Sequence, residues 1–283
     1  FVLLEYETGF NNYINYTLLI HQDYSNGIWA NTIEGLLYKK DLYTSYKSVL
    51  PYPEFRKGHN DVISMESDDT GNVYFNIRHN GLFRYNTAGD KAERLKFGDY
   101  FIKNYANKLK NDVSDKNLLW FAGNDGIGYF HKKSLDTVIF RPKNYLPDVG
   151  SNVIYRFAQS PDRKIYFVNT GRLYELDVKA NTMRECNRDF LIKGGFYAIS
   201  YLDNCLWIGT TENVYKYNLI HHSYDIIRRE DGVKFLKSIG IQADAYGSIW
   251  SVSGSEVTWI DPATCEVKHY HSPTPFVNGI GST

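Results

Sequence analysis

The stretch Gln22–Lys40, QDYSNGIWANTIEGLLYKK, decides the fold of this chain. Its Ser-Asn-Gly tripeptide at 25–27 is typical of a tight turn, and Ile28–Thr32 then forms an extended run. A Glu-Gly pair at 34–35 interrupts this run before the apolar residues Leu36–Tyr38. The stretch therefore predicts short strands joined by tight turns.

Five further stretches repeat this pattern, each around one aromatic residue. The six aromatic residues follow one another at intervals of 45, 46, 46, 41 and 43 residues: Trp29, Tyr74, Trp120, Tyr166, Trp207 and Trp250. A period of about 40 to 50 residues is typical of propellers and solenoids. With four short strands in each unit, it predicts an all-β fold, a β-propeller of four-stranded antiparallel blades.

We treat the 283 residues as a single propeller domain or segment. Residues 1–8 and 275–283 are predicted to be strands of incomplete or closing blades. The chain therefore looks like a part of a longer array. The sequence does not decide whether the ring closes with six or with seven blades. The predicted blade cores lie near 13–50, 60–98, 108–142, 152–188, 196–228 and 237–271.

The six repeated aromatic residues are expected to be structural. Each lies in the second predicted strand of its unit between apolar neighbours, so we expect it to wedge between adjacent sheets. A glycine or asparagine follows five to seven residues later in the first five units, where a residue tolerant of positive φ allows the chain to turn.

Composition excludes several classes of partner. The 32 basic residues cancel the 32 acidic ones, so the chain has no net charge to attract nucleic acid or an anionic membrane. It has neither an apolar run long enough to span a membrane nor a signal peptide at its start, and an exported protein whose signal had been removed would share this last feature.

The three cysteines, Cys186, Cys205 and Cys265, are too scattered to indicate a metal site; they are expected to be small apolar residues, or two of them could pair.

The repeated phrase D..G.lW..T..GL.rY resembles the two-component regulator propeller repeat. The match is strongest in the first, second and fifth units, at Asp23, Gly27, Trp29, Thr32, Gly35, Leu36 and Tyr38, at Asp69, Gly71, Tyr74, Gly81, Leu82 and Tyr85, and at Asp203, Trp207, Gly209, Thr210, Tyr215 and Tyr217. The fourth unit has tyrosine in place of tryptophan and lacks the D..G turn, and the third, fifth and sixth units also depart from the pattern. The resemblance implies the sensor region of a hybrid histidine kinase of Bacteroides type, located in the periplasm or on the outer side of the inner membrane. It also implies a small-molecule or oligosaccharide ligand, with kinase activity outside this chain, and a homodimer of the full sensor stays an open alternative.

Residues that would support catalysis or a cofactor are scattered. His269 and His271 would share one face of a strand and could both ligate a metal, but no third ligand is evident. The Ser-Pro-Asp tripeptide at 160–162 lacks the Gly-x-Thr-Trp that follows it in sialidase propellers. We therefore expect no catalytic residue, no metal and no cofactor in this segment.

The loops between blades are the best candidates for a binding site. Loops from an outer strand to the next inner strand mix aromatic, basic and amide side chains, which suits a sugar or a protein partner. They share one face of a propeller with the turns between second and third strands. The candidate ligand-binding residues from the loops are Arg56, His59, Tyr100, Tyr105, Arg141, Tyr145, Arg188 and Lys193, and those from the turns are Glu34, His79, Asp125, Asn169 and Glu212.

Three functions remain open from the residues. The first is a sensing propeller that binds a carbohydrate and performs no chemistry. The second is a scaffold for protein partners, which would expose a large apolar patch. The third is a lyase or glycosidase, which requires His, Glu or Asp side chains from several blades to converge.

Overall fold

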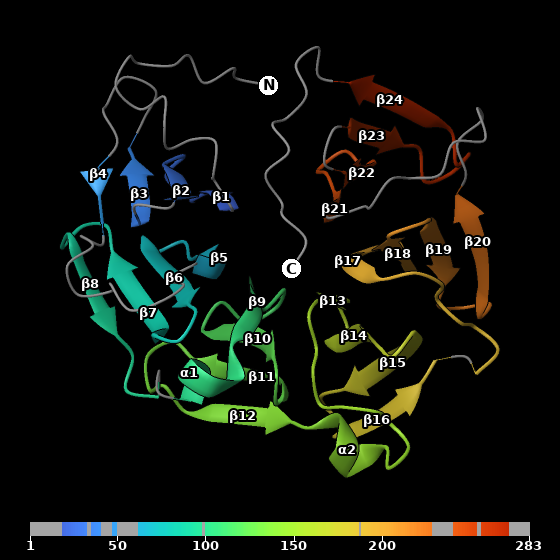
Figure 1. The fold of residues 1–283 in the computed structure, drawn as a ribbon, viewed down its shortest axis with the longest axis horizontal. Helices are drawn as coiled ribbons and strands as arrows, with labels where there is room; N and C mark the ends of the chain where they lie inside the picture. Colours follow the sequence, from blue (N-terminus) through green and yellow to red (C-terminus); the bar gives the residue numbers. More distant parts are fainter. Residues whose placement is uncertain are drawn as a thin grey trace. The chain divides into compact units, whose positions relative to one another are not determined.

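Six four-stranded antiparallel sheets make up the structure, a computed structural model that describes residues 19–32, 35–40, 47–49, 62–97, 100–186, 188–227, 240–253 and 256–271. In every sheet the strands follow one another in chain order (Figure 1). The fold is a β-propeller of six four-stranded blades, as the repeat predicts. Contacts divide the described chain into two compact units; the first contains residues up to Asn124 and Gly128–Val138, and the second contains Asp125–Ile127 and the residues from Ile139.

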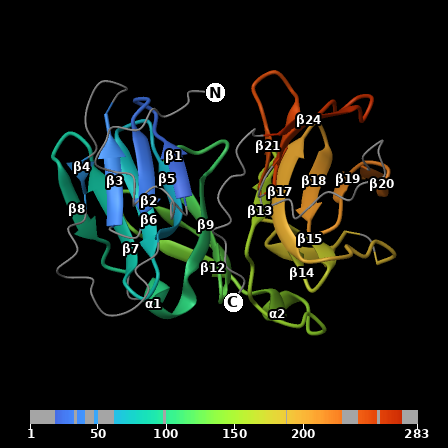
Figure 2. The same ribbon diagram turned by 45° about the horizontal axis from the view of Figure 1, so that its top comes forward.

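The first unit holds two complete blades and most of a third (Figure 2). Its strands are β1 (Leu19–Gln22), β2 (Ile28–Thr32), β3 (Gly35–Lys39) and β4 (Lys47–Ser48), then β5 (Val62–Ser67), β6 (Asn72–Ile77), β7 (Gly81–Asn86) and β8 (Lys91–Arg94), then β9 (Ala106–Asn111), β10 (Leu118–Gly123), β11 (Gly126–His131) and β12 (Thr137–Phe140). The last two strands each have residues in both units. A short helix, α1 (Tyr100–Asn104), precedes β9.

The second unit holds the remaining three blades. They consist of β13 (Phe157–Gln159), β14 (Lys164–Asn169), β15 (Arg172–Asp177) and β16 (Thr182–Glu185), then β17 (Phe196–Leu202), β18 (Cys205–Thr210), β19 (Val214–Asn218) and β20 (Ser223–Ile227), then β21 (Gly240–Ala243), β22 (Ile249–Val252), β23 (Glu256–Ile260) and β24 (Val267–His271). The helix α2 (Pro142–Tyr145) precedes the first of them. Neither short helix of the described residues has the length and hydropathy that a membrane span requires.

The cores of both units lie between successive blades. In the first unit Trp29 packs with Val62, Phe75 and Tyr85, so residues from β2 contact those of the next blade. In the second unit Trp207 packs with Ile241 in the same way. All six repeated aromatic residues lie in the second strand of their blades, and five of them are buried; Trp250 is half-buried. The three cysteines are free thiols, with Cys205 buried and the other two half-buried.

Candidate functional site

Ten of the thirteen predicted ligand-binding residues lie in the described part of the chain. Arg56, His59 and Glu34 fall outside it. Of the other ten, His79, Tyr100 and Tyr105 belong to the first unit, and the remaining seven belong to the second. Because each unit is a body of its own, we consider the sites of each unit separately.

In the first unit the structure brings His79 and Tyr105 together. His79 lies in the turn between β6 and β7 with a φ of 61°, and Tyr105 connects α1 to β9. The phenol oxygen of Tyr105 lies 3.0 Å from Nδ1 of His79, and the two rings meet edge to face with centroids 5.3 Å apart. The guanidinium carbon of Arg78 lies 5.8 Å from the centre of the Tyr105 ring. We refer to these three residues as the Arg78–His79–Tyr105 cluster.

Backbone contacts hold Tyr105 in place on both sides. A side chain at Gly123 would put its Cβ 2.1 Å from the carbonyl oxygen of Tyr105, so only glycine permits this close approach. The backbone N–H of Ala106 donates to Oδ1 of the buried Asn76 at 3.0 Å. The backbone N–H of Asn124 donates to the carbonyl of Asn104 at 3.1 Å. The loop that carries Tyr105 is therefore fastened to β6 and to the end of β10.

The chemistry of this cluster suits a polar ligand with an apolar face. His79 is exposed, while Arg78 and Tyr105 are half-buried. An aromatic ring can stack on the C–H face of a sugar, and guanidinium and imidazole groups can bond to its hydroxyl groups. Arg78 was not predicted, although its position beside His79 in the same turn would have indicated it.

Tyr100 has a different role. Its ring contacts Phe101 at 5.1 Å and Phe121 at 6.4 Å between centroids, in both cases edge to face. Phe101 is completely buried, so Tyr100 covers the apolar side of α1. In the structure it therefore belongs to the packing of the helix.

In the second unit, Arg141 and Asp125 form a bidentate ion pair. Nε and Nη2 of Arg141 both donate to Oδ2 of Asp125, at 2.9 and 2.7 Å, and Nε also lies 2.9 Å from Oδ1. The side chains are 39% and 24% exposed. The pair joins the residue before α2 to the turn between β10 and β11, so the Arg141 charge already has a carboxylate partner in the protein.

Tyr145 and Asn169 also make contacts within the protein. The phenol of Tyr145 donates to Oδ1 of Asn181 at 2.7 Å. Asn169 is buried, and its amide donates to the carbonyls of Ser151 and Val153 at 3.0 and 2.9 Å. Both residues thereby hold loops of the blade in place.

Arg188, Lys193 and Glu212 have exposed side chains. Their contacts involve the backbone: the Arg188 carbonyl accepts from Arg172, and the Lys193 N–H donates to the phenol of Tyr215. No described contact joins the three side chains to one another. The predicted second-unit residues therefore form three structural contacts and a set of separate exposed positions.

Carboxylates in the turns between first and second strands serve the fold. Asp23, Asp112 and Asp244 each accept a bond from the indole N–H of their blade's tryptophan, at 2.8, 2.7 and 2.7 Å. Each also accepts backbone N–H groups of its own turn. These aspartates are thus occupied in joining the turn to the repeated aromatic residue, which removes them as candidates for acid–base chemistry.

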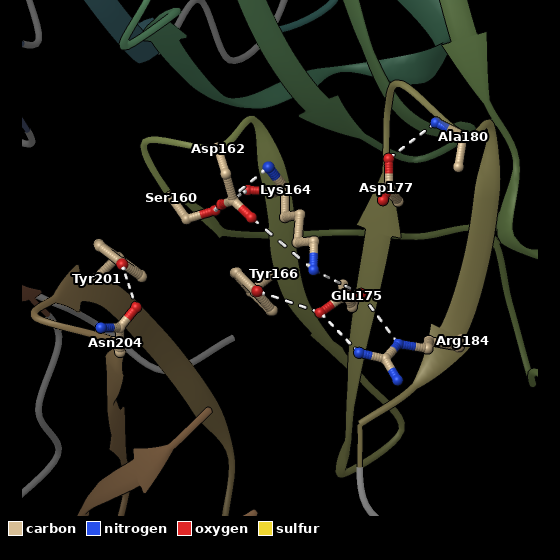
Figure 3. Close-up of polar contacts among 10 residues, drawn as sticks. All are labelled: Ser160, Asp162, Lys164, Tyr166, Glu175, Asp177, Ala180, Arg184, Tyr201 and Asn204. Atoms are coloured by element: carbon tan, nitrogen blue, oxygen red, sulfur yellow. Dashed lines mark hydrogen bonds and ion pairs between the residues drawn. The ribbon is translucent and has the colours of Figure 1, made fainter. Parts of the chain in front are cut away.

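In the fourth blade too, a carboxylate accepts a hydrogen bond from the repeated aromatic residue, but the residues differ (Figure 3). The phenol of Tyr166 donates to Oε2 of Glu175 at 3.1 Å, and Nε of Arg184 donates to Oε1 of the same carboxylate at 2.9 Å. Burial, together with the negative charge of Glu175, raises the pKa of Tyr166 well above its ordinary value. Glu175 is 6% exposed and lies on β15. It replaces the turn aspartate as the partner of the repeated aromatic residue.

His269 is engaged by its own blade. Its Nδ1 lies beside Oε1 of Glu256 and 3.1 Å from the hydroxyl of Thr258, which also donates to Glu256. The side chain of His271 falls outside the described set. Among the residues that the structure describes, no three His, Cys, Asp or Glu side chains gather in an arrangement that could hold a metal ion.

No model of a known protein family matches the sequence, and no curated protein matches it. Solved structures do match. One is the extracellular domain of BT4673 from B. thetaiotaomicron, described as a hybrid two-component system, with a TM-score of 0.69, 16% identity, 92% of this chain covered and 33% of that one. The corresponding domain of BT3049 from the same organism gives a TM-score of 0.68, 16% identity and coverage of 93% and 36%. This chain therefore spans about a third of the length of these structures.

Other propellers also share the fold. PorZ, a surface component of the type-IX secretion system of Porphyromonas gingivalis, gives a TM-score of 0.60 at 10% identity, covering 91% of this chain and 34% of that one. YCF48, solved with a D1 peptide, gives 0.64 at 9% identity, covering 89% and 81%. The comparisons confirm the predicted fold and its resemblance to extracellular domains of Bacteroides hybrid two-component systems.

Proposed function

We propose that this chain is a ligand-sensing propeller segment of an extracytoplasmic two-component signalling protein. Its ligand is a carbohydrate, and the segment performs no catalysis. The fold shared with extracellular domains of hybrid two-component systems supports the sensing function. The observation that carries carbohydrate binding is the Arg78–His79–Tyr105 cluster, in which a turn and a loop of two adjacent blades present an aromatic ring beside hydrogen-bonding groups.

In this function the ligand changes the relative stability of two signalling states. A ligand shifts such an equilibrium only by the difference between its affinities for the two states. The turn that carries His79 belongs to the second blade, and the loop that carries Tyr105 leads into the third. A sugar bound to both would favour the arrangement of these blades in which the two residues are close together.

The test is isothermal titration calorimetry of the purified chain against neutral mono- and oligosaccharides, after a thermal-shift screen selects the sugar class. Tyr105→Ala should weaken binding at least tenfold, because the sugar can no longer stack on the aromatic ring. Tyr105→Phe keeps the ring and should retain most of the affinity. Tyr246→Ala is the matched control, since Tyr246 is 94% exposed and lies in a turn between β21 and β22. Unchanged affinity in Tyr105→Ala, or no sugar bound by the folded protein, would refute the proposal.

A further inference from the structure

The register of the blades reveals an equivalent position on every innermost strand, directly opposite the repeated aromatic residue. Paired residues of adjacent antiparallel strands project to the same face of the sheet. The six residues at this position, in blade order, are His21, Glu66, Lys110, Ala158, Ser200 and Gln242. All three from the first unit are ionisable, and all three from the second are neutral.

Lys108 joins the ionisable three in the first unit. It lies two residues before Lys110 on β9, so both lysines project to the same face of the strand. Lys108 is close enough to act electrostatically on both His21 and Glu66, and Lys110 acts on Glu66. We call His21, Glu66, Lys108 and Lys110 the inner-strand charge cluster.

Two members of the cluster already have hydrogen-bond partners. The ring Nε2 of His21 lies 3.0 Å from the hydroxyl of Ser67, and burial, with the charge of Lys108, lowers the pKa of His21. Both effects favour the neutral form of its imidazole. The carboxylate of Glu66 accepts from the amide of Asn111 at 2.8 Å.

Lys110 lacks a comparable partner. It is half-buried, and within the described residues no carboxylate or hydrogen-bond acceptor lies within bonding distance of its ammonium group. Burial lowers its pKa, and the more distant charge of Glu66 offsets this only in part. The two lysines of the cluster outnumber its one carboxylate, and the other charges that act on it, Asp23 on His21 and Lys132 on Glu66, are of opposite sign. The cluster therefore has one positive charge in excess.

We propose that the inner-strand charge cluster is a second ligand site, separate from the loops, which takes a small carboxylate such as the acid group of a uronic acid. The Lys110 ammonium ion pairs with the carboxylate, and Lys108 supplies further attraction. A carboxylate suits the site because it restores the missing charge and accepts hydrogen bonds from an ammonium group at close range. Glu66 limits the charge of the ligand, since a single negative charge already neutralises the cluster.

The experiment is calorimetric titration of the full chain with glucuronate and with glucose at equal ionic strength, with sodium acetate as a third probe. Glucuronate should bind and glucose should not bind at this site. Lys110→Met should weaken glucuronate binding at least tenfold. Methionine matches the length of the lysine chain and removes only the charge, so the variant should remain folded, and Lys110→Gln provides a second neutral replacement. The control is Lys133→Met, at an exposed lysine, which should bind glucuronate like the parent chain.

Glucuronate binding that survives both Lys110 variants would overturn the proposal, as would equal affinity of the Tyr105→Ala variant for glucuronate and glucose, or no glucuronate binding. Competition by acetate would support it, because acetate carries only the recognised group. The variant Tyr105→Ala separates the two sites. It should abolish binding of the neutral sugar and leave glucuronate binding unchanged, so the failure of one proposal does not imply the failure of the other.

Discussion

Two buried tryptophans of this chain differ in a way that gives a measurable stability difference. Trp120 and Trp207 are both completely buried. The indole N–H of Trp120 donates to Oδ2 of Asp112 at 2.7 Å, whereas the indole N–H of Trp207 is buried and has no hydrogen-bond partner among the described residues. The turn before Trp207 consists of Asp203 and Asn204, and it is too short to place a carboxylate where Asp112 lies.

Replacement of each tryptophan by phenylalanine should therefore have unequal effects. Both replacements remove the same atoms and leave similar cavities, so this part of the cost is common to both. Trp120→Phe also breaks a bond to a charged acceptor, worth about 1.5 to 3 kcal/mol, whereas Trp207→Phe removes an unsatisfied donor that costs about 1 to 3 kcal/mol. Lys216 lies 5.6 Å from the centre of the Trp207 ring, and phenylalanine keeps part of that cation–π contact.

We expect Trp120→Phe to lower the free energy of unfolding by about 2.5 to 6 kcal/mol more than Trp207→Phe. The measurement is urea unfolding followed by circular dichroism, with the slopes compared to verify that the same surface unfolds. A double-mutant cycle of Trp120→Phe with Asp112→Ala isolates the bond itself and should give a coupling energy of about 1.5 to 3 kcal/mol. Equal losses of stability in the two phenylalanine variants would refute the argument that the turn aspartate stabilises the indole.

Three other predictions concern stability. Burial raises the pKa of Glu66 from 4.5 to about 6. The native state therefore holds this proton more tightly than the unfolded state, and stability from this group rises as pH falls from about 6 to 4.5. Glu66→Gln should thus be more stable than the parent by up to about 2 kcal/mol at pH 8 and equal to it near pH 4, measured by urea unfolding at both values. Gly126 has a φ of 124°, and an added Cβ would lie 2.3 Å from the Phe140 carbonyl oxygen, so Gly126→Ala should cost about 3 kcal/mol or more; a loss below 1 kcal/mol would contradict this. Trp207→Ala should lower stability by about 3 to 5 kcal/mol, whereas exposed Lys179→Ala should stay within about 0.5 kcal/mol, and similar thermal shifts in both would be incompatible with the burial of Trp207.

The blade pattern was predictable because its residues have few alternatives. Trp29 and Trp207 each fill the space between two sheets, and Gly81 and Gly126 adopt positive φ in turns, so the same residue types recur at a regular spacing. The turn aspartates recur for the same reason. The sequence predicts that Asp23 caps a strand, but its bond to the indole of Trp29 depends on a side-chain direction that spacing alone does not specify.

The candidate site was less predictable, because it depends on contacts between blades. His79 and Tyr105 are 26 residues apart, and their contact requires the turn of one blade to meet the loop of the next. By contrast, Arg141 and Tyr145 have the composition of ligand-binding residues, yet they bond to Asp125 and Asn181. Loop composition cannot separate these cases, since an arginine that binds a ligand and one that braces a loop are chemically identical.

Variation between blades does separate structural positions from those that are free to bind. The second-strand position is always aromatic because the packing of neighbouring sheets requires it, but the residue opposite it on the inner strand is histidine, glutamate, lysine, alanine, serine or glutamine. Packing therefore does not determine this residue. A half-buried lysine there costs desolvation energy that an alanine, as at position 158, would avoid. The charge of Lys110 attracts Glu66 of the preceding blade but has no hydrogen-bonded partner among the described residues. A bound anion would supply that partner, and Lys110→Met tests this explanation without disturbing the aromatic residue opposite.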